Sequence, residues 1–336
     1  MAGIAIIGCG SITRLRHAPE CRKNENIKLC GFFDVNQERC KEFAKEYHAK
    51  AYASYEEVLN DEAVDGVIIC TANRFHCEMT VKALEHGKHV MCEKPISVTL
   101  EEAQKMINAA DKAGKFLMIA HNQRFDAVNK KLKEIADSGE LGRIISFRTV
   151  FGHGGPENWS VDKSKNTWFL DKKQAGLGAM GDIGIHKADL IHWLINDDIK
   201  YVMGKVLTLD KKTADGELIA IDDNAFCVLE SETGIVGTLE ASWSHYGRCT
   251  NSTCLYFENG IVESDNELEE QIVIIKKDGT RQKFHIEEQG SGMAEAFAYC
   301  IDNNVKPEID GEEGRKALNI VLKCIESSEK NERVTI

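Results

Sequence analysis

The sequence IAIIGCGSIT, Ile4–Thr13, joins a short apolar run to a glycine-rich turn and then to the start of a helix expected from Ser11 to Lys23. Gly8 permits the tight turn after a strand, and Gly10 leaves room for a pyrophosphate to approach the backbone. The helix amides that follow carry partial positive charge, which attracts an anion. The stretch therefore predicts a dinucleotide-binding unit whose contacts include Gly8, Gly10, Ser11 and Ile12.

The next expected strand, IKLCGFFD, ends at Asp34, a little over twenty residues further on. A carboxylate at this place accepts hydrogen bonds from the adenosine ribose hydroxyls. The same charge repels a 2′-phosphate, so NAD(H) is favoured as cofactor over NADP(H), although Arg39 lies close enough to leave NADP(H) open. The alternative interpretation of Asp34 is a helix N-cap before Asn36.

The first 121 residues alternate strands and helices with short connections. Continuous apolar runs such as VDGVIIC, KHVMC and FLMIA are typical of strands covered on both faces. Ser54 and Thr99 each precede a glutamate at capping-box spacing, and Gly87 and Gly114 stand where helices end. This pattern predicts an α/β doubly wound parallel sheet of six strands, the Rossmann arrangement, over residues 1–121.

After about Asn122 the rhythm changes to mostly strands separated by turn signals such as Glu258-Asn259-Gly260. Residues 122–336 are therefore expected to form an α+β domain on a largely antiparallel open sheet. Helices are expected on one face of that sheet, and the other face is free for subunit contacts. A homodimer or homotetramer is expected.

Composition limits the classes of function. A net charge of -12 without a long basic run argues against nucleic acid or an anionic membrane as the partner. No uncharged apolar stretch approaches the ~20 residues that span a bilayer, and no secretory signal is evident. The twelve cysteines fall mostly in strand-like runs, which indicates buried thiols in a reducing, cytoplasmic setting. His245, Cys249 and Cys254 lack the spacing of a zinc site, so no metal is expected.

The stretch KHVMCEKPIS, Lys88–Ser97, sets two charged residues and a proline at the end of an apolar strand. Glutamate and lysine are costly to bury, and proline stops a strand. Ligands lie at the carboxyl ends of parallel strands, so Glu93 and Lys94 are interpreted as part of a cofactor site. A plain ion pair of Lys94 with Glu93 or another acid is the alternative.

The segment GDIGIHKADLIHWLI, Gly181–Ile195, is expected to be a helix with Asp182 and His186 one turn apart on one face. Histidine titrates near working pH, so His186 is a natural general base, and Asp182 can orient its ring or hold a substrate hydroxyl. Gly181 and Gly184 thin the helix surface beside this pair. A packing histidine is the alternative. Asp189 and His192 are interpreted as structural, with Asp189 a candidate partner for a nearby base.

With the Gly8-Cys9-Gly10 turn, CTANRFHCE (Cys70–Glu78), CEKPIS and the GDIGIH helix in this order, the chain resembles the Gfo/Idh/MocA oxidoreductases along essentially its whole length. This is the family of glucose-fructose oxidoreductase and inositol dehydrogenases. Two departures from the family pattern are Thr13, at the third position of the glycine fingerprint, and Phe169, where sugar-active members often carry arginine.

The resemblance implies roles for individual residues. It assigns Thr71, Asn73 and His76 to the cofactor diphosphate and nicotinamide ribose, and Glu93 and Lys94 to that ribose and the reacting carbon. It also implies a cis peptide at Pro95. Lys94, Asp182 and His186 are then the catalytic residues, with Lys94 placing a donor at the carbinol oxygen. Substrate contacts are expected from the two junction residues Asn122 and Arg124 and from three loop residues, His153, Trp159 and Trp168, although loop packing explains the last three almost equally well.

The expected function is that of an NAD-dependent dehydrogenase acting on a CH-OH group, namely a secondary hydroxyl of a sugar, sugar derivative or cyclitol. Two alternatives stay open. One is a redox-neutral glycosidase, lyase or epimerase that recycles a bound NAD in each turnover. The other is a non-catalytic nucleotide sensor, which does not need an acid–base pair.

Overall fold

The computed structural model describes residues 1–161, 163–287 and 290–336, and the chain divides into two compact units. The first unit comprises Met1–His121 and Gly290–Arg315. The second comprises Asn122–Gln289 and Lys316–Ile336. The return of Gly290–Arg315 to the first unit was not part of the sequence-based expectation.

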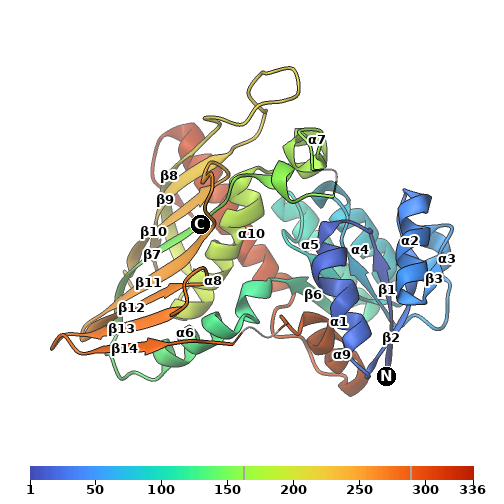
Figure 1. Ribbon diagram of the computed structural model, residues 1–336, viewed down its shortest axis with the longest axis horizontal. Helices are drawn as coiled ribbons and strands as arrows, with labels where there is room; N and C mark the ends of the chain where they lie inside the picture. The colour runs from blue at the N-terminus through green and yellow to red at the C-terminus, as the bar shows by residue number, and fades with distance from the viewer. Residues whose placement is uncertain (162, 288–289) are drawn as a thin grey trace. The chain divides into compact units, whose positions relative to one another are not determined.

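The first unit is built on the predicted six-stranded parallel sheet, in the order β3-β2-β1-β4-β5-β6 (Figure 1). Four of these strands are completely buried or nearly so, which explains their continuous apolar runs. The strands are β1 (Ala2–Ile7), β2 (Ile27–Phe33), β3 (Lys50–Ala51), β4 (Gly66–Ile69), β5 (His89–Glu93) and β6 (Leu117–Ala120).

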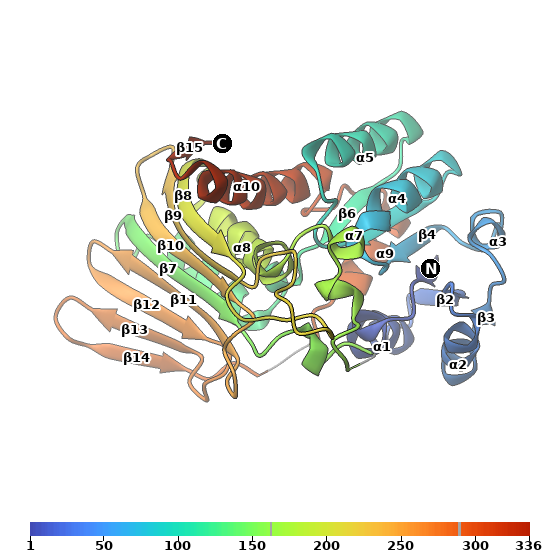
Figure 2. The ribbon, with the colours of Figure 1, turned by 90° about the horizontal axis from the view of Figure 1, so that it is seen from above.

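Helices cover both faces of this sheet, and Figure 2 shows α4 and α5 on one side with α1 and α2 on the other. Their bounds are α1 Ala18–Lys23, α2 Gln37–Tyr47, α3 Tyr55–Leu59, α4 His76–Glu85 and α5 Leu100–Ala113. The predicted N-caps are confirmed: Ser54 accepts from Glu57 N and Thr99 from Glu102 N. Gly114 ends α5 in the left-handed conformation, also as predicted.

The returning segment completes the first unit. Helix α9 (Met293–Asn303) packs beside α1 and β1, and Gly66 on β4 is shaped to receive it. A Cβ at Gly66 would lie 2.9 Å from Ile301 and 3.0 Å from Phe297. Farther along, Ile119 N of β6 donates to Ile309 O over 2.9 Å. Segments from opposite ends of the chain therefore form one core.

The second unit contains a nine-stranded sheet in the order β14-β13-β12-β11-β7-β10-β9-β8-β15 (Figure 1). Neighbouring strands are antiparallel except for the parallel pair β7 and β10, as the prediction of a largely antiparallel sheet requires. The strands are β7 (Ile144–Gly152), β8 (Ile199–Leu207), β9 (Asn224–Ser231), β10 (Val236–Ser242), β11 (Thr250–Phe257), β12 (Gly260–Asp265), β13 (Ile272–Lys276), β14 (Arg281–Phe284) and β15 (Val334–Thr335).

One face of this sheet carries α6 (Ala127–Asp137) and α8 (Ile185–Ile195), which contact β12 and β7 respectively. Helix α10 (Gly311–Lys330) begins in the first unit and ends in the second, where Ser327 and Ser328 accept from backbone amides of β8. The opposite face of β8, β9 and β10 exposes the apolar residues Met203, Phe226, Val228 and Val236, the first to 54%.

Candidate functional site

The glycine-rich turn has the geometry of a phosphate cradle. Gly8 has a φ of 97°, and a Cβ there would lie 2.6 Å from Cys70 O, so only glycine fits. At Gly10 no atom lies within 4 Å of the position of a Cβ, so the backbone is open to a close approach. Ser11 and Ile12 open the following helix, and Arg14 N donates to Gly10 O over 3.2 Å. The turn therefore presents an accessible helix start.

Thr13 shows how the imperfect fingerprint is accommodated. Its side chain is fully buried, and its hydroxyl donates to Gly8 O over 2.6 Å. The residue also begins η1 (Thr13–His17), a π-helical turn that precedes α1. A side-chain hydrogen bond thus closes the turn where the usual sequence has a third glycine.

Asp34 follows β2, and its carboxylate reaches back to the glycine-rich turn. One oxygen accepts from Cys9 N and the other from Asn36 N, both over 2.7 Å. Asn36, not Asp34, is the N-cap of α2, because its side chain accepts from Arg39 N. Each carboxylate oxygen has two lone pairs, so Asp34 retains capacity to accept a ribose hydroxyl.

The segment after β4 brings Thr71, Asn73 and His76 to the same edge of the sheet. Thr71 Oγ1 is buried and has no hydrogen-bond partner among the residues that the structure describes, so it is available to a ligand atom. Asn73 begins the short helix η2 (Asn73–Phe75). The His76 ring is fully buried between two carbonyl oxygens, Pro95 O at 2.8 Å and Thr71 O at 3.0 Å. Its burial lowers its pKa, and both nitrogens contact backbone, so His76 links two strand ends.

The end of β5 holds a buried hydrogen-bonded pair of side chains that the sequence did not indicate. Glu93 Oε1 lies 2.7 Å from His17 Nε2, and both side chains are almost completely buried. Burial by itself raises the pKa of Glu93, but the His17 hydrogen bond and the nearby positive charges outweigh it and lower the pKa to about 2. Glu93 Oε2 accepts from Lys94 N over 3.2 Å, and the Lys94–Pro95 peptide is cis, as the resemblance implied.

These features of the first unit fit a dinucleotide. Gly10 leaves open space where a Cβ would stand, Thr71 Oγ1 lacks a partner in the described chain, and Asp34 keeps lone pairs beyond its two backbone contacts. All lie beyond the carboxyl ends of β1, β2 and β4, where open α/β sheets bind ligands.

In the second unit Asp182 lies in a second π-helical turn, η6 (Met180–Gly184), directly before α8. Its carboxylate accepts from the indole Nε1 of the fully buried Trp243 over 3.2 Å. The backbone at the start of η6 is held by Asp222, whose carboxylate accepts from Gly178 N and Met180 N. Burial raises the pKa of Asp222 to about 6. Pi-helical turns recur at functional sites, and this one fixes Asp182 from two sides.

The glycines around Asp182 serve packing. A Cβ at Gly181 would lie 2.2 Å from Leu177, and one at Gly184 would lie 2.6 Å from Met180 Sδ and 3.2 Å from Ala241 on β10. Both glycines therefore make room for protein side chains, and they add no support for a ligand beside His186.

His186 is 8% exposed and begins a series of aromatic contacts. Its ring centroid lies 5.7 Å from that of Phe151 on β7. The series continues from Phe151 to His153 at 6.0 Å, from His153 to Trp159 at 6.3 Å, and from Trp159 to Phe169 at 4.9 Å, and it ends with Trp168 stacked on Phe169 at 3.8 Å. The three predicted loop aromatics thus join one cluster with His186. Phe151 and Phe169 are members that the sequence did not single out.

A buried ion pair anchors the loop that carries these rings. Lys211 Nζ lies 2.5 Å from Glu157 Oε1 and donates to Gly154 O over 2.7 Å. The Lys211 side chain is nearly completely buried, and Tyr246 covers it at 4.7 Å. His153 and Trp159 therefore sit on a loop with fixed attachments, so their rings can form a preorganised wall.

Of the two junction residues, Asn122 begins η3 (Asn122–Arg124) and is partly exposed. Arg124 is 5% exposed and forms a bidentate bond with Asp189 of α8, the shorter contact being 2.7 Å. This buried pair fits the structural interpretation of Asp189 and favours a structural role for Arg124 as well.

Lys187, next to His186, is a further buried charge that sequence reasoning missed. The residue is 1% exposed, and its amine lies 3.4 Å from Thr253 Oγ1 and 5.9 Å from the centroid of the Phe151 ring. Burial lowers the pKa of Lys187 to about 7, although Asp126 and Asp265 act in the opposite direction. The one sequence signal that could have indicated a buried lysine here is its position directly after His186.

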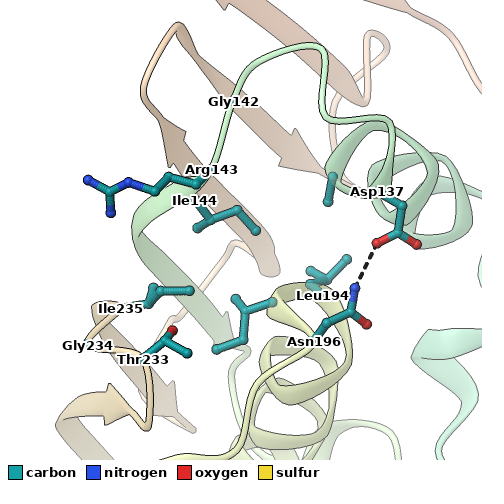
Figure 3. A pocket seen from close by; sticks show the side chains of 11 residues that line it. Asp137, Gly142, Arg143, Ile144, Leu194, Asn196, Thr233, Gly234 and Ile235 are labelled. Atoms are coloured by element: carbon teal, nitrogen blue, oxygen red, sulfur yellow. Dashed lines mark hydrogen bonds between the residues drawn. The ribbon is translucent and has the colours of Figure 1, made fainter.

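A pocket lies at the other end of α8, near Leu194 and Asn196 (Figure 3), and its volume is about 320 Å³. Asn196 Nδ2 donates to Asp137 there over 2.9 Å. None of the predicted site residues lines this pocket, so it is separate from the surroundings of His186.

Over residues 1–161, 163–287 and 290–336, no group of three histidine, cysteine or acidic side chains is arranged to hold a metal ion. In the same residues no helix is both long and apolar enough to cross a bilayer.

The fold and the cradle at Gly8 define the first unit as a Rossmann-type dinucleotide-binding domain, and the comparisons agree. Residues 2–121 match the model of the oxidoreductase family with an NAD-binding Rossmann fold, and residues 129–263 match the model of the GFO/IDH/MocA C-terminal domain. The chain belongs to the Gfo/Idh/MocA oxidoreductase family. The predicted family resemblance, the predicted fold class and the predicted class of enzyme, an NAD(P)-dependent oxidoreductase, are therefore confirmed.

Myo-inositol 2-dehydrogenase of Thermotoga maritima is 27% identical over 99% of this chain and 98% of that protein. Glucose-6-phosphate 3-dehydrogenase of Bacillus subtilis is 32% identical over 67% of this chain, and the match spans 63% of that protein. Levoglucosan dehydrogenase, solved in complex with NADH and levoglucosan, superimposes with a TM-score of 0.88 at 21% identity, covering 100% of this chain and 99% of that one. This last likeness shows the fold alone.

Proposed function

We propose that the protein transfers a hydride between NAD(H) and a secondary hydroxyl of a sugar, sugar derivative or cyclitol. The observation that carries the proposal is the contact series from His186 through Phe151 to His153 and Trp159, which joins a titratable ring to a fixed aromatic wall. Aromatic faces suit the apolar face of a sugar ring. The names of the two relatives, a myo-inositol 2-dehydrogenase and a glucose-6-phosphate 3-dehydrogenase, support the same substrate class.

The cofactor would be held by the first unit. Gly8, Gly10 and the helix start at Ser11 and Ile12 receive the diphosphate, and Asp34 accepts from the adenosine ribose. Thr71, Asn73 and Glu93 line the nicotinamide half, while His76 holds the segments after β4 and β5 together. The Asp34 charge favours NAD(H) over NADP(H), because a 2′-phosphate would meet a carboxylate.

When bound, NAD⁺ supplies the hydride acceptor. The remaining task is proton transfer, and His186 takes the hydroxyl proton in oxidation and returns it in reduction. Asp182, fixed by Trp243, holds a substrate hydroxyl or the imidazole. Lys94 donates to the carbinol oxygen and stabilises the developing alkoxide. His153, Trp159 and Trp168 are assigned to the substrate, and Asn122 remains a candidate contact.

The test is turnover with NAD⁺ and a panel of polyols and sugars, followed at the absorbance of NADH. Net NADH with at least one cyclitol or sugar is the expected result. If product forms without net NADH, and a carbon-bound hydrogen of the substrate exchanges with solvent, the proposed dehydrogenase is wrong and the redox-neutral alternative is favoured. Binding of NADH without turnover of any panel member would favour the nucleotide sensor.

We also propose that two copies pair through the exposed face of β8, β9 and β10. Met203 and Val228 are directly paired across strands there, and Phe226 and Val236 extend the apolar surface. Charged neighbours such as Lys205 and Glu230 lie on the same face, which suits a self-complementary contact. Analytical ultracentrifugation of the wild type and of a Phe226→Asp, Val228→Lys variant tests this. A dimer lost in the variant is expected, and a monomeric wild type would contradict the proposal.

A further inference from the structure

His17 lies at the point where the glycine-rich turn is connected to the strand end that carries Lys94. It is the last residue of the π-helical turn η1, whose first residue, Thr13, is bonded to Gly8. Its imidazole Nε2 lies 2.7 Å from Glu93 Oε1. The other Glu93 oxygen accepts from Lys94 N. One short series of contacts therefore runs from Gly8 to Lys94 within a single unit.

Both members of the His17–Glu93 pair are buried, His17 completely and Glu93 to within a few per cent. His17 Nδ1 has no hydrogen-bond partner in the described part of the chain, so the bond to Glu93 is the polar contact that orients this ring. An ionised carboxylate taken out of water requires such a donor, and charge-assisted bonds are the strong ones. The pair is therefore too costly to be incidental packing.

We propose that His17 is a positioning residue for the nicotinamide half of the cofactor site. It keeps Glu93 ionised and in place, and Glu93 in turn holds the Lys94 backbone. The proposal rests on the proposed function, in which Glu93 serves the nicotinamide ribose. It adds that the action of Glu93 depends on a side chain 76 residues earlier in the chain, in the helical turn that follows the glycine-rich turn.

The two halves of the cofactor allow a sharp test. ADP carries the adenosine ribose and the diphosphate but lacks the nicotinamide ribose. A residue that acts through Glu93 affects the binding of NADH and leaves that of ADP unchanged. A residue that merely supports the turn at Gly8 affects both ligands equally.

The experiment measures dissociation constants of NADH and ADP by calorimetry for the wild type and for His17→Phe, His17→Gln and His89→Gln. His17→Phe is expected to weaken NADH about tenfold and to change ADP less than about twofold. His17→Gln, whose amide still donates to Glu93, is expected to recover most of the affinity. His89 lies at the other end of the same strand, so its variant is the control and keeps both affinities.

Measuring the NADH affinity over a range of pH distinguishes positioning of Glu93 from a purely structural role, because a structural role would not change the pH dependence. Without the His17 donor, burial raises the pKa of Glu93, so in His17→Phe the affinity for NADH falls as the pH is lowered through the mildly acidic range. In the wild type Glu93 does not take up a proton in that range, because its pKa is about 2, so the additional fall belongs to the variant.

Equal losses of ADP and NADH, or an unchanged NADH affinity in His17→Phe, would overturn the proposal. If His17→Phe does not fold, the pH series is recorded for His17→Gln, whose neutral amide is a weaker donor than the imidazole. Its NADH affinity should fall more steeply than that of the wild type as the pH is lowered, while ADP affinity stays the same, and identical pH series for NADH would overturn the proposal. A wild type that binds ADP and NADH but turns over no sugar refutes the proposed function alone, and this assay still tests His17.

Discussion

The indole Nε1 of Trp243 donates a hydrogen bond to the carboxylate of Asp182 over 3.2 Å, from the end of β10 to the π-helical turn before α8. Trp243 is fully buried, so this bond fixes the carboxylate from the protein side. The orientation of the Asp182 carboxylate therefore depends in part on a residue of another element.

Replacing Trp243 by phenylalanine removes this donor and keeps most of the buried ring. Turnover is expected to fall about tenfold, because the loss of a hydrogen bond to a charged group costs roughly 1.5–3 kcal/mol. NADH affinity is expected to be unchanged, since Trp243 lies in the second unit. Trp193→Phe, on the last turns of α8, is the control. Unchanged steady-state rates in Trp243→Phe would contradict the role given to Asp182.

Asp34→Ala tests the cofactor preference. The substitution removes the acceptor proposed for the ribose hydroxyls and the charge that repels a 2′-phosphate. The dissociation constant of NADH is expected to rise about tenfold or more, and that of NADPH much less. Fluorescence titration with both dinucleotides provides the measurement, and Asp111→Ala, on exposed α5 surface, is the control. Equal losses of the two affinities are incompatible with the ribose assignment.

Lys94→Ala separates chemistry from binding. The bond between Lys94 and Glu93 uses the Lys94 backbone nitrogen, so it survives the loss of the side chain. Turnover is expected to drop by about 10²–10⁴, as for loss of a general acid–base group, with little change in NADH affinity. Lys105→Ala on α5 is the matched control. A variant that retains most of its turnover would remove Lys94 from the mechanism.

Lys187→Met concerns stability. The folded pKa of Lys187 is lowered to about 7 from 10.5, so the unfolded chain takes up the proton first as the pH falls. The free energy of unfolding of the wild type therefore decreases between about pH 10 and pH 7. Methionine removes this dependence and is expected to raise stability at pH 7 by on the order of 1–3 kcal/mol. Thr253 keeps its 2.9 Å bond to Thr149.

Chemical denaturation at pH 7 and at pH 9.5 measures this difference. Lys41→Met, at an exposed position of α2 and outside the proposed dimer face, is the control and should change neither value by more than ~0.5 kcal/mol. A Lys187→Met protein that is less stable than the wild type at pH 7 would show that the amine contributes favourable interactions after all.

Local signals made much of the fold predictable. The glycine turn at Gly8, the caps Ser54 and Thr99, and the apolar strand runs each act within a few residues, and the structure confirms the elements that they predicted. Asp34 was correctly placed beyond β2 for the same reason.

The contacts that sequence reasoning missed join distant residues. His17 and Glu93 are 76 positions apart, and Trp243 and Asp182 are 61 apart, so no periodic pattern connects either pair. Arg124 gave no sign that its partner is Asp189, 65 positions away. The two π-helical turns, η1 and η6, were not predicted either, because one extra residue in a helical turn does not change the amino-acid composition in a recognisable way.

The passage of α10 from one unit to the other without a break has a practical consequence for protein engineering. A gene fragment that stops after His121 omits α9 and the strand-like contact at Ile309, so Gly66 and Ile119 would face water. Such a fragment is expected to aggregate. Isolating the nucleotide-binding half calls for splicing Gly290–Arg315 directly behind residue 121.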